Sequence, residues 1–479
     1  METHPQNLAE LSVSETVALI HSGALTARQS AEAALERAKN NPFNAFEVVT
    51  AELARTQAKA LDALSAQELR QLPLAGVPVA IKAENAIAGL PTTYGGQAQT
   101  TAATAHSEVV RKLIAAGALI IGTTRMPEFG QFPFTESPHW GSVTNPVAPG
   151  RTTGGSSGGS AAVVAGGIVP AAVGGDGGGS IRIPAAACGL VGLKPVRGRV
   201  SAAPETDLWG ALGVIGVLTR TVADTALLYD VISGATSGDR YRAPAWEQPL
   251  QSAYQSESGN RKLRIGWCVT PFSFLIKLDP EVKAVLEKVK TNLEAAGHQV
   301  VDIGSWPDAR SSFFPQFFAA LAAESRRVEN PQRLEKRTRQ SVQVGKLVSS
   351  RLLARAEAKG AQLAQKLPRK YAAYDVLISP TLACVPGEEA PLGNCGALTG
   401  LLRSIPMAAF TGLANVTGAP AVSLPAGLSA DGVPIGMQVS VFGKDEAELI
   451  RFARLWEDLR AGVANRAETK HLNESEPTS

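Results

Sequence analysis

A glycine-rich stretch over residues 150–184, GRTTGGSSGGSAAVVAGGIVPAAVGGDGGGSIRIP, constrains this chain more than any other feature. It contains 12 of the 46 glycines of the chain. Glycine disfavours helices and strands because it has the most backbone freedom to lose. A flexible linker would not alternate with apolar runs such as residues 161–165 and 168–173, which predict a buried helix and a buried strand. We therefore expect the glycines to lie in a packed core, where backbone N–H groups can converge on a ligand.

The flanking sequence indicates the fold class. Residues 107–116 predict an amphipathic helix, and residues 118–124 predict a buried strand after a turn at Gly117. Helices that alternate with strands apolar throughout are typical of α/β proteins, whose sheets are covered on both faces. With 44% hydrophobic and 19% charged residues, the chain can form a substantial core. We predict an α/β fold, with one mixed, twisted sheet and helices on both faces, as a single domain over residues 1–479.

Sequence patterns divide this domain into five segments. They are N-terminal helices (7–65), the part of the core that holds the glycine-rich stretch (71–235), a variable and mostly helical region (240–370), the C-terminal part of the core (371–460) and a charged tail expected to be disordered (464–479).

Charge and cysteine usage narrow the classes of function. The formal net charge is +3 and the basic residues are scattered, which argues against a nucleic-acid partner. The four cysteines form no C-x-x-C pair and the six histidines no H-E-x-x-H motif, so we expect no metal site. We find neither a secretory signal nor an apolar run long enough to span a membrane. The expected location is the cytoplasm, without membrane contact.

Lys82 is the first candidate for chemistry. Residues 77–81 predict a short apolar strand that ends in this lysine. A lysine at a strand end commonly extends its ammonium group to water. In a dry pocket, by contrast, desolvation lowers the pKa of the lysine and makes the neutral amine a usable base. The strand alone does not decide between these two interpretations.

The glycine turns do not match the known nucleotide-binding loops. A phosphate-binding loop of the type G-x-x-x-x-G-K-[ST] needs a lysine after its second glycine, whereas Gly159 is followed by Ser160. The dinucleotide motif G-x-G-x-x-G must follow a strand and precede an acidic residue, and this stretch does neither. We therefore do not expect a nucleotide.

Two serines in the glycine turns provide the second candidate. Ser156 and Ser180 are separated by the predicted helix and strand, which can fold the two turns together. A serine hydroxyl is a poor nucleophile unless a base accepts its proton, and no Ser-His-Asp or G-x-S-x-G pattern is visible. Lys82 is the available base, and a Lys82–Ser156–Ser180 relay would activate a serine. Such a site also needs N–H donors for a developing oxyanion, each worth about 3 kcal/mol; Gly177, Gly178 and Gly179 precede Ser180.

A loop-rich segment over residues 126–149 groups four aromatic side chains, Phe129, Phe132, Phe134 and Trp140. Core packing is the simpler interpretation, and an apolar wall beside a site is the functional one. His139 in the same segment is expected to be structural.

Four sequence blocks together resemble the amidase signature family. In chain order they are GVPVAIK, GGSSGGSAA, GGDGGGSIRIPA and CGLVGLKP, and the similarity extends over residues 10–460. The resemblance implies that Ser180 is the nucleophile, that Lys82 is the base and that Ser156 bridges them from a cis non-proline peptide. It also implies an oxyanion hole in the backbone of residues 177–180. Members hydrolyse carboxylic amides through an acyl-enzyme, without metal or cofactor.

The same comparison marks supporting residues and departures. Asp176 and Arg182 occupy positions that match the family, and we expect them to shape the nucleophile loop as a charge pair. Ser157 is expected to be a further supporting residue. The chain departs where Ala83-Glu84-Asn85 follows the lysine in place of a common Asp, and where Gly177 replaces a larger Thr or Ile. Thr153 also stands where Pro is frequent. These changes remove no catalytic atom, so they bear on substrate class rather than on reaction type.

The predicted function is that of a serine amidohydrolase acting on a small amide, with no cofactor. Homodimers occur in the family. Two alternatives stay open. One is the glutaminase-like subunit of a tRNA-dependent amidotransferase, which requires a partner subunit. The other is a catalytically silent binding protein, against which the joint presence of Lys82, Ser156 and Ser180 argues, since a scaffold needs none of them.

Overall fold

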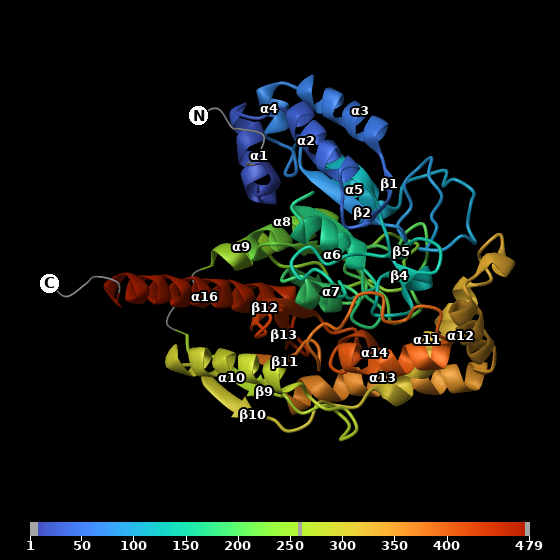
Figure 1. The fold of residues 1–479 in the computed structure, drawn as a ribbon, viewed down its shortest axis with the longest axis vertical. Helices are drawn as coiled ribbons and strands as arrows, with labels where there is room; N and C mark the ends of the chain where they lie inside the picture. Colours follow the sequence, from blue (N-terminus) through green and yellow to red (C-terminus); the bar gives the residue numbers. More distant parts are fainter. Residues whose placement is uncertain (1–7, 257–260, 475–479) are drawn as a thin grey trace.

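A central sheet of eleven strands organises the structure, a computed structural model that describes residues 8–256 and 261–474 (Figure 1). From one edge to the other its strands are β1 (Phe46–Val49), β3 (Leu119–Thr124), β2 (Pro78–Lys82), β6 (Ala171–Gly175), β8 (Ile215–Thr219), β7 (Val191–Lys194), β12 (Ala421–Leu428), β13 (Pro434–Ser440), β11 (Val376–Pro380), β9 (Arg264–Trp267) and β10 (Gln299–Asp302). A separate two-stranded ribbon consists of β4 (Glu136–Ser137) and β5 (Gly141–Ser142).

The sheet is mixed, as predicted. Strand β2 runs parallel to β3 and β6, and β9 runs parallel to β10 and β11, whereas the pairs from β6 through β13 are antiparallel. All residues of β2, β3, β6 and β8 are buried. Because both faces of these strands are covered, their sequences are mostly apolar and do not alternate between apolar and polar residues. Helices cover both faces of the sheet, which confirms the predicted fold class.

Helices of the first half of the chain are α1 (Val13–Ser22), α2 (Ala27–Lys39), α3 (Ala51–Asp62), α4 (Ala66–Leu69), α5 (Glu108–Ala115), α6 (Gly158–Ala165), α7 (Arg182–Ala187) and α8 (Val222–Ile232). Those of the second half are α9 (Leu250–Gln255), α10 (Pro280–Ala295), α11 (Arg310–Glu324), α12 (Lys336–Lys346), α13 (Ser350–Lys370), α14 (Ala397–Ala408), α15 (Gly412–Thr417) and α16 (Glu446–Glu474). One core contains side chains of α5, α8, α10 and α16, and a second contains those of α2, α3 and α6.

Helices α11, α13, α14 and α15 contribute side chains to a third core cluster, beside the sheet (Figure 1). Aromatic and aliphatic side chains of α11 and α15 meet Trp209 and Trp306 in one buried cluster. Because this cluster lies against the glycine-rich turns, it supplies one wall of the cavity described below.

Some boundaries differ from the predictions. The expected strand over residues 168–173 begins only at Ala171, because Pro170 has no N–H group to pair in a sheet. The segment expected to contain only N-terminal helices also contributes strand β1 at the sheet edge. Helix α16 continues to Glu474, through most of the tail expected to be disordered from residue 464; residues 475–479 lie outside the described part. None of the described helices is long and apolar enough to cross a membrane.

Candidate active site

Lys82 lies at the end of β2 with only 1% of its surface exposed. Its Nζ donates to Ser156 Oγ at 2.8 Å and to the carbonyl oxygen of Gly175 at 3.3 Å. Strands β2 and β6 are parallel neighbours, so their carboxyl ends, at Lys82 and Gly175, meet at the same edge of the sheet. Burial lowers the pKa of Lys82, and the carboxylates of Glu84 and Asp176 offset part of that effect. Lys82 therefore lies in a buried site and does not extend its ammonium group to water.

The turn before α6 carries Ser156. The Gly155–Ser156 peptide bond is cis, as the family resemblance implied, and the serine is 1% exposed. The next residue, Ser157, joins the two glycine turns: its N–H donates to the carbonyl oxygen of Ser180 at 3.1 Å, and its Oγ donates to that of Gly175 at 3.2 Å.

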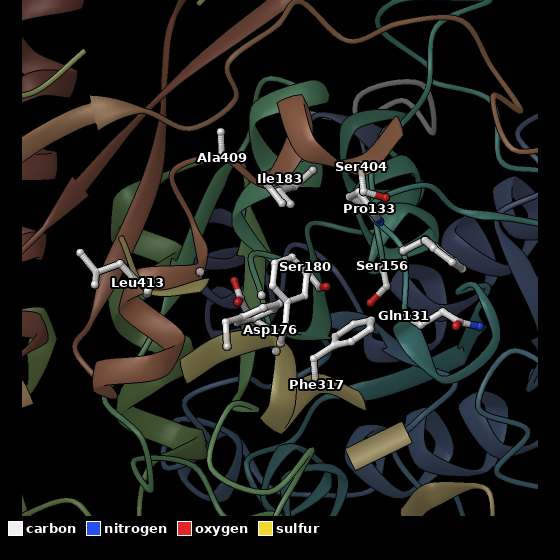
Figure 2. Close-up of a pocket in the computed structure, with 18 of the residues that line it drawn as sticks. Gln131, Pro133, Ser156, Asp176, Ser180, Ile183, Phe317, Ser404, Ala409 and Leu413 are labelled. Carbon is white, nitrogen blue, oxygen red and sulfur yellow. The ribbon is translucent and has the colours of Figure 1, made fainter. Parts of the chain in front are cut away.

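Ser180 lies between β6 and α7 and is partly exposed. It lines the same cavity as Ser156 and Lys82, and Figure 2 shows both serine side chains among the residues that line that cavity. The fold thus brings together the three residues that sequence reasoning selected. An accessible serine thus shares a cavity with a buried serine–lysine hydrogen bond, an arrangement that a serine nucleophile requires.

Backbone donors surround Ser180. The N–H groups of Gly177, Gly178 and Ser180 have no acceptor in the part of the chain that the structure describes. The N–H of Gly179, in contrast, donates to Asp176 Oδ1 at 2.7 Å, so it is not free for an oxyanion as we had expected. Gly177 and Gly178 line the cavity.

Gly179 instead has a conformational role. Its φ is +128°, and an added Cβ would lie 2.5 Å from Thr411 Oγ1. We predict that Gly179→Ala lowers the free energy of unfolding by about 1–3 kcal/mol and displaces Ser180. At Gly177 an added Cβ would meet Trp209 only at an ordinary distance of 3.5 Å, so Gly177→Ala is the matched control for folding. Thermal denaturation of both variants tests this, and equal melting temperatures would contradict it.

A buried ion pair holds the turn between Asp176 and Arg182, both 0% exposed. Arg182 Nη2 donates to Asp176 Oδ1 at 2.9 Å, and Nε donates to Oδ2 at 3.0 Å. Asn415 and the Ile181 N–H also donate to this carboxylate. Burial by itself would raise the pKa of Asp176. The positive charge and hydrogen bonds of Arg182 have a larger effect in the opposite direction, and they hold this pKa well below its usual range. The expected charge pair is present.

Residues far along the chain complete this network. Arg182 Nη1 donates to Gln438 Oε1 at 2.6 Å and to the carbonyl oxygen of Thr411 at 2.9 Å. Every donor and acceptor of the pair is thereby used, which a buried charge pair requires. Sequence reasoning assigned no role to Gln438, Thr411 or Asn415, because no local pattern marks a residue more than 200 positions away as a partner.

The cavity in front of Ser180 has a volume of about 310 Å³ and is mainly apolar. Of the aromatic residues in the loop over residues 126–149, only Phe132 lines this cavity, whereas Phe129 and Phe134 pack in the core. The loop therefore contributes both to core packing and to the apolar wall of the site. The remaining large apolar side chains of the wall are Ile183, Leu208, Trp209, Phe272, Leu275, Ile276, Trp306, Phe313, Phe314, Phe317, Leu401, Ile405 and Leu413.

Comparisons with known proteins agree with this geometry. Residues 29–450 match the family described as Amidase. A relative from Mycobacterium tuberculosis named "Putative amidase AmiB2" is 36% identical over 461 residues, which are 95% of this chain and 97% of the relative. Another, "Putative amidase AmiA2" from the same organism, is 38% identical over 421 residues, 86% of this chain and 85% of the relative.

Solved structures give the same result. The 6-aminohexanoate cyclic dimer hydrolase complexed with substrate superposes with a TM-score of 0.86 at 31% identity, covering 95% of this chain and 97% of that one. A bacterial aryl acylamidase of the amidase signature family superposes with a TM-score of 0.82 at 27% identity, with coverages of 94% and 96%. Fold, site and relatives define an enzyme that hydrolyses carbon–nitrogen bonds of amides. The chain belongs to the amidase signature family.

Proposed function

We propose that Ser180 attacks the carbonyl carbon of an amide while Ser156 and Lys82 move its proton. The 2.8 Å hydrogen bond from Lys82 Nζ to Ser156 Oγ, inside a dry site, carries this proposal. Neutral Lys82 accepts the hydroxyl proton of Ser156, and Ser156 in turn accepts the hydroxyl proton of Ser180. The N–H groups of Gly177 and Gly178 stabilise the oxyanion. Ser156 then returns the proton to the leaving amine, and water releases the acid from the acyl-enzyme.

The substrate in this proposal is a small amide with an uncharged aryl or alkyl group. Trp209, Phe313 and Phe317 offer apolar surface beside Ser180, which favours such groups over charged ones. The names of the similar enzymes, an aryl acylamidase and an aminohexanoate dimer hydrolase, are consistent with this class.

Release of amine or ammonia from a panel of aryl, alkyl and amino-acid amides tests the function. We expect kcat/KM for anilides and medium-chain alkyl amides to exceed that for glutamine by about 10- to 100-fold, because each buried methylene contributes about 1–3 kcal/mol to discrimination. A preference for glutamine would instead support the amidotransferase subunit. Absence of both turnover and labelling of Ser180 by a fluorophosphonate would support the binding protein.

The partner required by this proposal is the small amide alone. The homodimer, the absence of a nucleic-acid partner and the cytoplasmic location remain predictions from the sequence. Size-exclusion chromatography with light scattering measures the first of these directly.

A further inference from the structure

Glu84 lies in the turn that follows β2, two residues beyond Lys82, and its side chain is 5% exposed. It lines the catalytic cavity. Its Oε1 lies 3.2 Å from Lys82 Nζ and accepts no hydrogen bond in the described part of the chain. A buried carboxylate is costly unless a cation or donors compensate it, and Lys82 is the cation in contact with it.

The backbone holds Glu84 in this place. The N–H of Ala83 donates to the carbonyl oxygen of Thr124 at 3.1 Å, and the N–H of Asn85 donates to that of Lys82 at 2.9 Å. A Cβ on Gly175 would overlap Glu84 Oε1, so the glycine that ends β6 leaves room for the carboxylate. The pair is therefore built into the turn rather than formed by a free side chain.

Other charged and titratable groups face this pair. Asp176 also attracts the Lys82 ammonium, but it is neutralised by its ion pair with Arg182. Glu324 of α11 and the hydroxyl of Tyr94 both interact with the charge of Glu84 from a greater distance. Across the described residues, Glu84 forms an ion pair with Lys82 and with no other cation.

We propose that Glu84 is a positioning residue for Lys82, and that its carboxylate stabilises the ammonium form of Lys82 during turnover. This inference rests on the proposed function of Lys82 as the base. When Ser180 bonds to the carbonyl carbon, its proton passes to Ser156, and the proton of Ser156 passes to Lys82 Nζ. The neutral amine becomes an ammonium beside Glu84, and the proton later returns through Ser156 to the leaving nitrogen. No proton or electron is gained or lost overall.

The sign of the effect follows from the charges. Burial opposes the ammonium form, and Glu84 favours it, so Glu84 makes Lys82 a stronger base than burial alone would leave it. In Glu84→Gln the neutral amine persists to lower pH. The acidic limb of the pH–rate profile then moves to lower pH, by about one unit or more for charges in contact inside a protein. The plateau rate at high pH falls, because a weaker base takes the proton.

The experiment measures the second-order rate of Ser180 labelling by a fluorophosphonate against pH, which requires no knowledge of the natural substrate. The full-length wild type is compared with Glu84→Gln and Glu84→Asp. Glu324→Gln is the matched control, since it removes a partly buried carboxylate that interacts with the charge of Glu84 and does not contact Lys82. We expect the acidic limb to move in Glu84→Gln and to stay near the wild-type position in Glu84→Asp and Glu324→Gln.

An acidic limb that coincides in Glu84→Gln and the wild type would overturn the inference, as would an equal shift in Glu324→Gln. If Glu84→Gln does not fold, Glu84→Met, uncharged and of similar volume, carries the same expectation. If labelling of the wild type requires Lys82 but the acidic limb is the same in Glu84→Gln, only the role of Glu84 is refuted. Wild-type labelling that is absent or independent of Lys82 refutes both this inference and the proposed mechanism.

Discussion

Ser180→Ala is expected to lower kcat by about 10⁴- to 10⁶-fold on any amide that the wild type hydrolyses. The change removes the one atom that would form the acyl-enzyme, and the remaining donors and cavity can accelerate the reaction only weakly. The KM should change little, because the apolar wall that binds the substrate is intact. Initial rates with an anilide, and loss of fluorophosphonate labelling, measure the effect.

Ser325→Ala provides the matched control for this loss. Ser325 follows the last residue of α11, its hydroxyl donates to the carbonyl oxygen of Ala322, and it does not line the cavity. We expect wild-type kcat and labelling in this variant. Retained turnover in Ser180→Ala at more than about one hundredth of the wild-type rate would remove Ser180 from the role of nucleophile.

Lys82→Met is expected to lower kcat/KM by about 10²- to 10⁴-fold, the range attributed to a general base. The wild type should itself depend on pH. Burial holds the pKa of Lys82 below its ordinary value, and only the neutral amine accepts a proton. Activity therefore rises as pH increases through that lowered pKa and becomes level above it. The acidic limb should disappear in Lys82→Met.

Lys112→Met is the control for the lysine. Its Nζ donates to the carbonyl oxygens of Ser233 and Gly234, outside the cavity, and burial lowers its pKa as well. This variant should retain the acidic limb of the wild type. A wild-type rate that is already level at about pH 5 would count against a neutral lysine as the base.

Much of the site was predictable because its signals are local. Glycine clusters that alternate with apolar runs identified the two turns, and the apolar strand before Lys82 predicted a charged side chain at the carboxyl end of that strand. The order of these blocks then identified the family and predicted which residues form its Ser-Ser-Lys set. The pairing of the parallel strands β2 and β6 then brings Lys82 and Gly175 into contact from distant parts of the chain.

What the sequence by itself determined is therefore the α/β class and the reaction type. It also selected Lys82, Ser156 and Ser180, which the fold brings to one cavity and whose catalytic roles stay predictions. The tertiary structure alone decided which groups surround them. It showed that Asp176 uses the Gly179 N–H, that Asn415 and Gln438 complete the ion pair, and that Glu84 contacts Lys82. The apolar wall likewise combines side chains from β6–α7, α11 and α14. The contacts of Asn415 and Gln438 and the apolar wall join segments far apart in the chain, and local periodicity and motif spacing carry no record of such pairs. The contacts Asp176–Gly179 and Lys82–Glu84 are close in sequence, but they depend on the conformation of the turns, which residue types alone do not specify.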